Sequence, residues 1–455
     1  MTESRHSARG QDSLAQRVRE VASVSWPLVA GSAVSLLTAV ADTAILGQYD
    51  TIELSVMARA VVIFIFCTAL LIPIGTAVQI VGAQWYGAED TGRVARLLTR
   101  SGLLTLTLGV FLGAALFLAS PWLLVITGAT ASPEEEMGAI EVLRILALCI
   151  PAVALSGAAR GWLGAQSRTK VVLLNAAVVN LGNIAISITL VFGLELGAQG
   201  AAWGTTTAHY LGLAVCLALA LHRRRRLDVP DDPNNAPVVR PLGKVAWPDV
   251  VFGTATYGGD MLIVSAVAVL GAVDLAGYRI ASSTVAILFT VAFTCGSGIS
   301  ILVGHRLGAR DFRHGLAYAR AGALFMGGCV GLAALPVLLI PERYVRIFST
   351  EEAVIEAIRP VLILFWLITP LIVASIAMAA VVRAVGDTKA MMYIGIAAQL
   401  VVALPAAWLL GVWAGWGLFG VVLALGLSWL TRTLLTIWRL RRTTARFAGE
   451  QVPAA

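Results

Sequence analysis

Long apolar stretches, separated by short polar connections, follow one another along almost the whole chain. A helix needs about 20 residues to cross the hydrocarbon core of a membrane, and twelve stretches reach that length. Lipid offers no partner to open backbone groups, so each stretch is predicted to be an α-helix. The expected fold class is an all-α membrane protein with twelve transmembrane helices. The stretches lie at residues 24–47, 55–82, 97–120, 140–163, 171–193, 199–221, 246–271, 276–303, 315–340, 357–382, 391–412 and 416–438.

The chain also repeats itself at a constant offset of about 221 residues. The matching pairs are Trp26-Pro27 with Trp247-Pro248, and Gly87-Ala88-x-Asp90 with Gly308-Ala309-x-Asp311. Two copies of one bundle with a cleft between them form an architecture typical of transporters. We therefore expect two pseudo-symmetric lobes of six helices each, with a central cleft.

This repeat sets the expected domain organisation. It comprises an N-terminal tail (1–22), an N-lobe (23–221), a linker (222–244), a C-lobe (245–440) and a C-terminal tail (441–455). The linker contains four consecutive arginines, Arg223 to Arg226, followed by an Asp-Asp-Pro-Asn-Asn segment. The arginines are an orientation signal or, alternatively, bind anionic lipid headgroups.

Composition and charge agree with a membrane location. Hydrophobic residues make up 58% of the chain and charged residues 13%, and the mean hydropathy is +0.85. The net charge of +7 does not indicate nucleic-acid binding, because the basic residues gather on one side of the predicted helices. By the positive-inside rule, that side is cytoplasmic and holds both termini, which predicts a multi-pass membrane protein. Only six basic residues lie on the other side: Arg59, Arg144, Arg279, Arg343, Arg346 and Arg359.

Several kinds of chemistry find no support in the sequence. The five cysteines fall inside apolar runs without a CxxC pair, which argues against disulfides and thiolate metal sites. No P-loop for ATP hydrolysis is present, and of the five histidines only His209 is expected within the membrane. We expect no enzyme activity, no cofactor and no metal. The energy must come from an ion gradient, a partner or the gradient of the substrate itself.

Four groups of residues together form a recognisable pattern between about residues 20 and 440. They are Asp42-Thr43-Ala44-Ile45-Leu46-Gly47 after Trp26-Pro27; Gly82-Ala83-Gln84-Trp85-Tyr86-Gly87-Ala88 with its counterpart Gly304-His305-Arg306-Leu307-Gly308-Ala309; Arg160-Gly161-x-x-Gly164 with Arg383-x-x-Gly386-Asp387-Thr388-Lys389; and Asn183 with Gly200-Ala201-Ala202. In combination they resemble the MATE (multidrug and toxic compound extrusion) family, and the chain is most similar to its bacterial DinF-like branch. The resemblance implies two six-helix lobes, a V-shaped cleft and drug efflux driven by inward H⁺ or Na⁺.

Asp42 is the first candidate for ion coupling. An acid at mid-membrane costs roughly 2.5–3.5 kcal/mol of insertion free energy, so it needs a reason to be there. Ser32, Ser35, Thr38 and Asp42 follow each other at helical spacing, which predicts a polar stripe turned away from lipid. An acid held by hydrogen bonds between helices, or solvated near the outer interface, is the alternative. The resemblance gives Asp42 a coupling role and makes Pro27 a hinge in the same helix, although Pro27 could also simply start that helix.

The fifth and sixth predicted helices carry further candidates. Asn180, Asn183 and Ser187 share one helical face, and Thr205 precedes His209 by one turn. The resemblance assigns Asn183 and Thr205 to a network around the first-helix acid. Ser187 stands where related sequences have an aspartate, which weakens a multi-carboxylate Na⁺ site and favours H⁺. His209 is either a titrating group or a structural residue between helices.

Asp260 is the second intramembrane acid, with Tyr257 beside it. By resemblance it matches an acidic position of the C-lobe used for cation coupling. It could accept a proton, face a cationic drug, or be an acid paired with an arginine or a hydroxyl group. We assign Asp42, Asn180, Asn183, Thr205 and Asp260 to ion coupling, and the expected cleft residues are Ser35, Thr38, Ser187, His209 and Tyr257.

The function predicted is secondary active export of small organic, cationic amphiphilic compounds in exchange for H⁺ or Na⁺. The protein is expected to act as a monomer among membrane lipids by alternating access, in which each ligand shifts the equilibrium only by its differential affinity. The alternative is a flippase for lipids or lipid-linked oligosaccharides.

Overall fold

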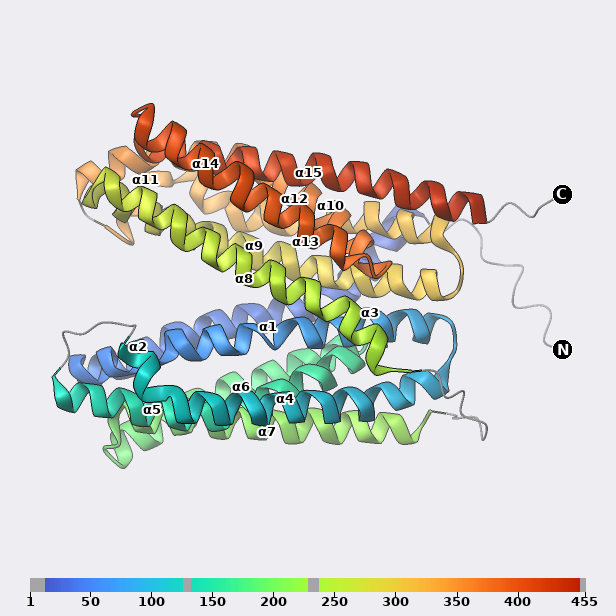
Figure 1. Ribbon diagram of the computed structural model, residues 1–455, viewed down its shortest axis with the longest axis horizontal. Helices are drawn as coiled ribbons and strands as arrows, with labels where there is room; N and C mark the ends of the chain where they lie inside the picture. The colour runs from blue at the N-terminus through green and yellow to red at the C-terminus, as the bar shows by residue number, and fades with distance from the viewer. Residues whose placement is uncertain (1–12, 126–131, 228–236, 350, 451–455) are drawn as a thin grey trace. The chain divides into compact units, whose positions relative to one another are not determined.

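A computed structural model describes residues 13–125, 132–227, 237–349 and 351–450, and it contains helices without strands in these ranges (Figure 1). Twelve helices are long and apolar enough to cross a membrane, as the apolar pattern predicts. The first half contains α1 (Leu14–Tyr49), α2 (Thr51–Ala69), α3 (Ile72–Gly87), α4 (Thr91–Val125), α5 (Pro133–Ala165), α6 (Thr169–Ile188), the π-helical segment η1 (Thr189–Gly193) and α7 (Gly197–Arg225). Helices α2 and α3 together form one span, Thr51–Gly87.

The second half repeats this order with more interruptions. It contains α8 (Val239–Leu270), α9 (Ala272–Gly308), α10 (Phe312–Leu339), the short α11 (Pro341–Arg346), α12 (Glu352–Ala384), α13 (Thr388–Ile396), η2 (Ala397–Ala403), α14 (Leu404–Ala406), η3 (Ala407–Trp413) and α15 (Gly417–Glu450). The elements from α13 to η3 form a single span, Thr388–Trp413.

The helices extend beyond the apolar runs that predicted them. α1 begins at Leu14, inside the expected N-terminal tail. α7 ends at Arg225 and α8 begins at Val239, both inside the expected linker. α15 continues to Glu450, inside the expected C-terminal tail. The reason is physical, because hydropathy marks only the part of a helix that meets lipid, whereas helical hydrogen bonding continues into water. The rest of the expected tails and linker, residues 1–12, 228–236 and 451–455, lies outside the described residues.

The chain divides into two compact units, but the division does not fall at the 222–244 segment. One unit is Pro27–Val250, and the other combines Val251 onward with the part of the chain before Pro27. The boundaries therefore lie inside the continuous helices α1 and α8, next to the repeated Trp-Pro pairs. Pro27 lies in the interior of α1, so it does not start that helix.

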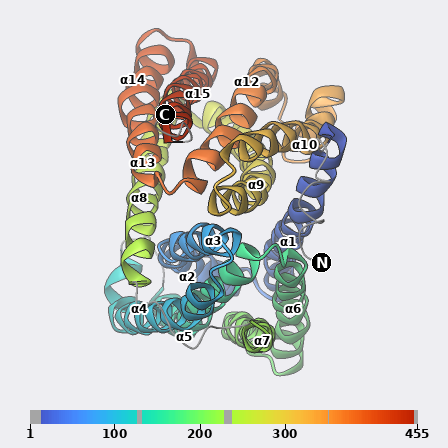
Figure 2. The same ribbon diagram turned by 90° about the vertical axis from the view of Figure 1, so that its right-hand side faces the viewer.

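The Pro27–Val250 unit is organised around α5, which packs against α2, α3, α4 and α7 (Figure 2). Trp162 of α5 is fully buried and donates its indole N–H to the backbone oxygen of Val94 at 2.6 Å, which fixes α5 against α4. Large apolar side chains remain on the outside, for example Phe111 and Trp122, each 72% exposed. An apolar outer face around a helical core is the pattern expected for a protein surrounded by lipid.

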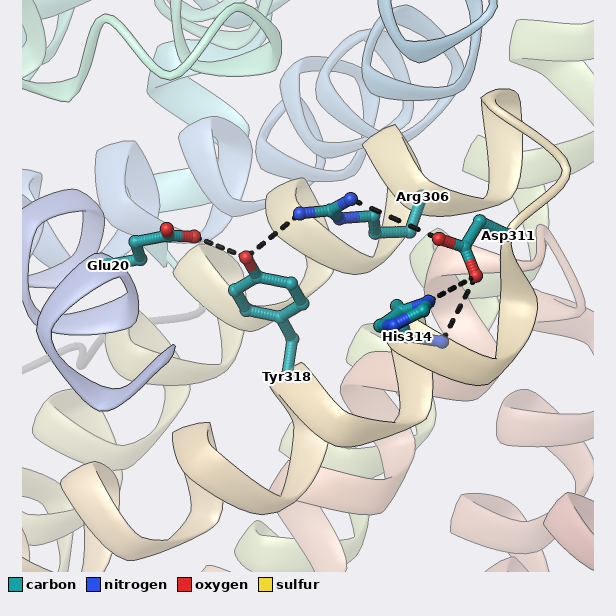
Figure 3. Close-up of polar contacts among 5 residues, drawn as sticks. All are labelled: Glu20, Arg306, Asp311, His314 and Tyr318. Atoms are coloured by element: carbon teal, nitrogen blue, oxygen red, sulfur yellow. Dashed lines mark hydrogen bonds and ion pairs between the residues drawn. The ribbon is translucent and has the colours of Figure 1, made fainter. Parts of the chain in front are cut away.

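In the other unit, α9, α10 and α12 pack against one another, and α12 also packs against α15 (Figure 2). The start of α1 joins this group. Tyr318 of α10 is almost fully buried; its hydroxyl donates a hydrogen bond to Glu20 of α1 and accepts one from Arg306 of α9 at 3.0 Å (Figure 3). The guanidinium of Arg306 also lies 5.1 Å from the ring of Tyr318. This polar cluster holds the segment of α1 before Pro27 in the C-terminal unit.

The repeated Gly-Ala-x-Asp motif has the same structural role in both halves. Glu89 and Arg310 occupy the x position, and both have φ of 57°, in the left-handed region that ends a helix. The aspartate that follows caps the next helix: Asp90 accepts from the backbone N–H of Arg93 at 2.8 Å, and Asp311 accepts from that of His314 at 3.3 Å. Asp311 also contacts the ring Nδ1 of His314 at 2.8 Å (Figure 3). The motif therefore builds a tight turn between two helices in each half.

Candidate functional site

The Pro27–Val250 unit contains a hydrogen-bonded network around Asp42. The Oδ2 atom of Asp42 accepts from the side-chain amide of Asn183 at 3.2 Å, and the same amide lies 3.4 Å from the Thr205 hydroxyl. Ser187 donates to the Oδ1 atom of Asn183 at 2.7 Å. Helices α1, α6 and α7 thus bring together four residues that the sequence had singled out. Every partner in this network is uncharged.

A close helix crossing positions these side chains. A Cβ atom built on Gly204 of α7 would lie 2.2 Å from the Ser187 hydroxyl oxygen and 3.0 Å from the Ser187 backbone. The crossing therefore requires glycine, and it places Thr205 of α7 beside Asn183 of α6. Asn183 and Ser187 are both buried, at 5% and 0% exposure. Their geometry is fixed by packing as well as by hydrogen bonds.

At Asn180, about one helical turn before Asn183, the same face of α6 contacts the polar stripe of α1. The side-chain amide of Asn180 donates to the Ser35 hydroxyl at 3.2 Å and to the backbone oxygen of Ala176 at 2.6 Å. Thr38 is buried and donates to the backbone oxygen of Val34 at 3.0 Å. Ser35 therefore contributes to the contact between α1 and α6, and Asn180 is linked to α1 through it.

One oxygen of Asp42 distinguishes this acid from an ordinary interhelical contact. Its Oδ1 atom is buried and has no hydrogen-bond partner among the described residues. A buried carboxylate oxygen without a partner is costly as long as the group is charged. Binding a proton would remove that charge. A Na⁺ ion would require several oxygen ligands, and Asp42 is the only carboxylate in the network described above.

His209 is not part of the hydrogen-bonded network. It lies one turn after Thr205 on α7 and is half-buried. Both alternatives open from the sequence, a titrating group or a structural residue between helices, stay predictions.

The C-terminal unit contains a second network, around Asp260 of α8. The side-chain amide of Gln399, in the π-helical segment η2, donates to the Oδ1 atom of Asp260 at 2.9 Å. The Oε1 atom of Gln399 accepts from the Nη2 atom of Arg432 on α15 at 3.2 Å. Asp260 is thus connected to an arginine through one amide, without a direct ion pair between the two among the described residues. Tyr257 is 52% exposed.

Two features hold this second network in place. A Cβ atom on Gly259 would lie 2.6 Å from the Cγ atom of Gln399, so only glycine allows α8 and η2 to approach this closely. The guanidinium of Arg432 lies 5.0 Å from the ring centroid of Trp429 and 5.5 Å from that of Phe252. These are cation–π distances.

Sequence reasoning missed Gln399 and Arg432. Arg432 lies within the span Gly417–Thr444, inside the apolar stretch expected at 416–438. The available signal was its position inside an apolar run, where a charged residue generally has a function or a partner. Gln399 gave no comparable signal, since an amide in an apolar helix is common and η2 cannot be recognised from hydropathy.

Twelve spanning helices in two repeated halves, with one acid-centred network in each compact unit, define a polytopic transport protein of the membrane. The comparison with known sequences then gives the family. The MatE family matches residues 27–189 and 252–409, and the chain belongs to this family, whose members are transporters and not enzymes.

Individual relatives and structures agree over nearly the full length. The probable multidrug resistance protein NorM of Pseudomonas putida is 26% identical over 462 residues, which cover 95% of this chain and 96% of the relative. A multidrug resistance MATE family transporter of the MOP superfamily, solved in an outward-facing conformation, has a TM-score of 0.86 at 17% identity over 95% of this chain and 97% of its own. A MATE structure in a bent conformation has a TM-score of 0.83 at 17% identity over 97% of this chain and 98% of its own. At these identities the solved structures show the fold. Placement in the DinF-like branch stays a prediction.

Proposed function

We propose that the protein is a secondary active multidrug exporter that exchanges organic, cationic amphiphilic compounds for H⁺ by alternating access. It acts in the inner membrane of a bacterium with both termini in the cytoplasm. Relatives named as multidrug resistance proteins over 95% of the chain support the export of drugs. The distribution of arginines supports the orientation.

The choice of H⁺ rests on one observation, the buried Oδ1 atom of Asp42. The carboxylate has only neutral hydrogen-bond partners, and one oxygen is unsatisfied, so the charged form is expensive inside the unit. Protonation removes this cost, and loss of the proton requires access to water. Asp42 is therefore suited to bind a proton from one side of the membrane and release it to the other, with Asn183 and Thr205 orienting it.

Pro27 gives the same helix a place to bend. It lies inside α1, at the boundary between the two compact units. Proline leaves the backbone oxygen four residues earlier without its helical partner, which is the usual cause of a kink. A bend at Pro27 would move Asp42 relative to α6, and a related MATE has been solved in a bent conformation.

Everted membrane vesicles test this proposal. The wild-type protein should take up a cationic dye when the vesicle interior is made more acidic than the outside, and a Na⁺ gradient alone should have no effect. Asp42→Asn should abolish the response to the pH gradient, because an amide cannot exchange a proton. Asp50→Asn is the matched control: Asp50 caps α2 just outside the span by accepting from the N–H of Ile52 at 2.8 Å, and asparagine caps equally well.

Two results would overturn the proposal. Full pH-driven uptake in Asp42→Asn would remove Asp42 from coupling. Uptake driven by a Na⁺ gradient but not by a pH gradient would replace H⁺ by Na⁺ as the coupling ion.

A further inference from the structure

The two acid-centred networks differ in their charge. Asp42 has hydrogen bonds only to neutral groups, whereas Asp260 is joined through Gln399 to the guanidinium of Arg432. The Asp260 network therefore carries one negative and one positive charge. Tyr278 of α9 also interacts electrostatically with Asp260, and Arg383 of α12 with Arg432. Both leave the surroundings of Asp260 neutral or positive.

Arg432 is held in position from several sides. The rings of Trp429 and Phe252 lie 5.0 and 5.5 Å from its guanidinium carbon, and its Nη2 atom donates to Gln399, which is only 4% exposed. Its Nε atom is buried without a hydrogen-bond partner among the described residues, but the two aromatic faces and the hydrogen bond to Gln399 hold the planar group in place. Its positive charge is part of the site.

The oxygen atoms beside Asp260 would otherwise suit a small cation. A carboxylate and the Oε1 atom of a glutamine are the hard ligands that Na⁺ and similar ions take. In this protein Oε1 of Gln399 is occupied by Arg432. A cation that approached Asp260 would be repelled by the guanidinium of Arg432, which is linked to Asp260 through Gln399. The Oε1 atom of Gln399 would not be available to it as a ligand.

We propose that the guanidinium of Arg432 serves as a resident cation for Asp260, in the place that a mobile coupling ion would otherwise take, and so excludes Na⁺ from the C-terminal unit. The proposal rests on the ion-coupled export proposed above and makes Arg432 a residue that determines ion specificity. It also assigns the two acids different tasks, since Asp260 has a positive charge in its network and Asp42 has none among the described residues.

Replacement of Arg432 should create a Na⁺ dependence. In Arg432→Gln, Na⁺ at about 100 mM should raise the melting temperature of the purified protein relative to choline, because a bound ion stabilises the folded state. Removal of one partner of a charge pair is strongly unfavourable, so pH-driven dye uptake should fall at least about tenfold without Na⁺ and recover with it. Wild type should show neither response.

Three variants serve as matched comparisons. Arg439→Gln removes an arginine from the same helix that is also paired with an aspartate, Asp387 at 2.5 Å, and it should not respond to Na⁺. Arg432→Lys keeps the charge and should also stay insensitive to Na⁺. The double variant Asp260→Asn/Arg432→Gln leaves neither charge of this pair without its partner, so it should fold without Na⁺ and its melting temperature should not respond to Na⁺.

The outcomes separate this inference from the proposed function. An Arg432→Gln protein that transports and melts as the wild type does, without a Na⁺ response, overturns the inference and leaves proton-coupled export intact. If Arg432→Gln does not fold, the double variant must restore folding, and its failure to do so overturns the inference as well. Absence of pH-driven uptake in the wild type contradicts the proposed function, while the effect of Na⁺ on the melting temperature of Arg432→Gln still tests the role of Arg432.

Discussion

The crossing of α6 and α7 at Gly204 makes a specific prediction, because it controls the position of two network residues. In Gly204→Ala, the new methyl group would lie 2.2 Å from the Ser187 hydroxyl oxygen. Rotating that hydroxyl away would break its 2.7 Å hydrogen bond to Asn183. The methyl group would also lie 3.0 Å from the Ser187 backbone N and Cα atoms, which no side-chain rotation can move. The two helices must therefore separate by a few tenths of an ångström.

This separation lowers the stability of the protein and, more importantly, moves Asn183 away from Thr205. Overpacking of this kind costs about 1–3 kcal/mol, partly offset by the helix propensity of alanine, which is about 1 kcal/mol better than that of glycine. The contact between Asn183 and Thr205 is 3.4 Å, already near the limit for a hydrogen bond. A small separation is enough to break it. We expect a moderate loss of thermal stability and a severe loss of pH-driven dye uptake.

Gly182→Ala is the control on the same helix pair. Its methyl group would lie 3.8 Å from the Ala208 side chain, an ordinary van der Waals distance, although Gly182 is next to Asn183. This variant should transport normally and be as stable as the wild type or more so. Ser187→Ala added to Gly204→Ala removes the hydroxyl clash and leaves the backbone contact, so only part of the stability should return. Normal uptake by Gly204→Ala, or equal damage by Gly182→Ala, would refute the reasoning.

Two more predictions concern the turns and the start of α1. Tyr318→Phe removes the hydroxyl that links Glu20 to the C-terminal unit and should lower the free energy of unfolding by about 1.5–3 kcal/mol, the usual range for hydrogen bonds to charged groups. A double-mutant cycle with Glu20→Gln measures this coupling, and a value near zero would contradict it. For Asp90, burial alone would raise the pKa, but the hydrogen bonds and positive charge of Arg93 outweigh it and hold the pKa below its ordinary value. Stability from the Asp90 charge is then fully present above the ordinary pKa of about 4 and is lost as the pH falls through the lower value in the folded protein. The melting temperatures of wild type and Asp90→Asn should differ by a constant amount at neutral pH and converge in acid, and a difference that grows in acid would show the opposite shift.

Properties that depend on one stretch of chain were predictable from sequence. The number of spanning helices follows from apolar length alone, and the polar stripe of α1 follows from helical spacing. The contact of Asp42 with Asn183 lies between α1 and α6, and only the family resemblance indicated it. Several predicted helices were too short, for example at the start of α1 and at the end of α15, because hydropathy reports where lipid ends and not where the helix ends.

The C-terminal network could not be predicted for a different reason. Asp260, Gln399 and Arg432 come from α8, η2 and α15, and their contacts depend on the close approach at Gly259. No spacing in the sequence connects these three positions. The π-helical segment η2 adds to the difficulty, since an extra residue per turn shifts which side chains share a face while leaving the hydropathy unchanged.

The Trp-Pro pairs have a mechanical consequence. The chain passes from one compact unit to the other at two points, between Trp26 and Pro27 in α1 and between Val250 and Val251 in α8, and both points lie inside a continuous helix. A helix resists twisting and stretching, whereas a flexible loop would absorb both. A movement between the units would therefore bend these two helices, and each of them has a proline nearby that removes a backbone hydrogen bond. The repeat thus places a proline beside each passage between the units, at a point where a continuous helix bends most easily.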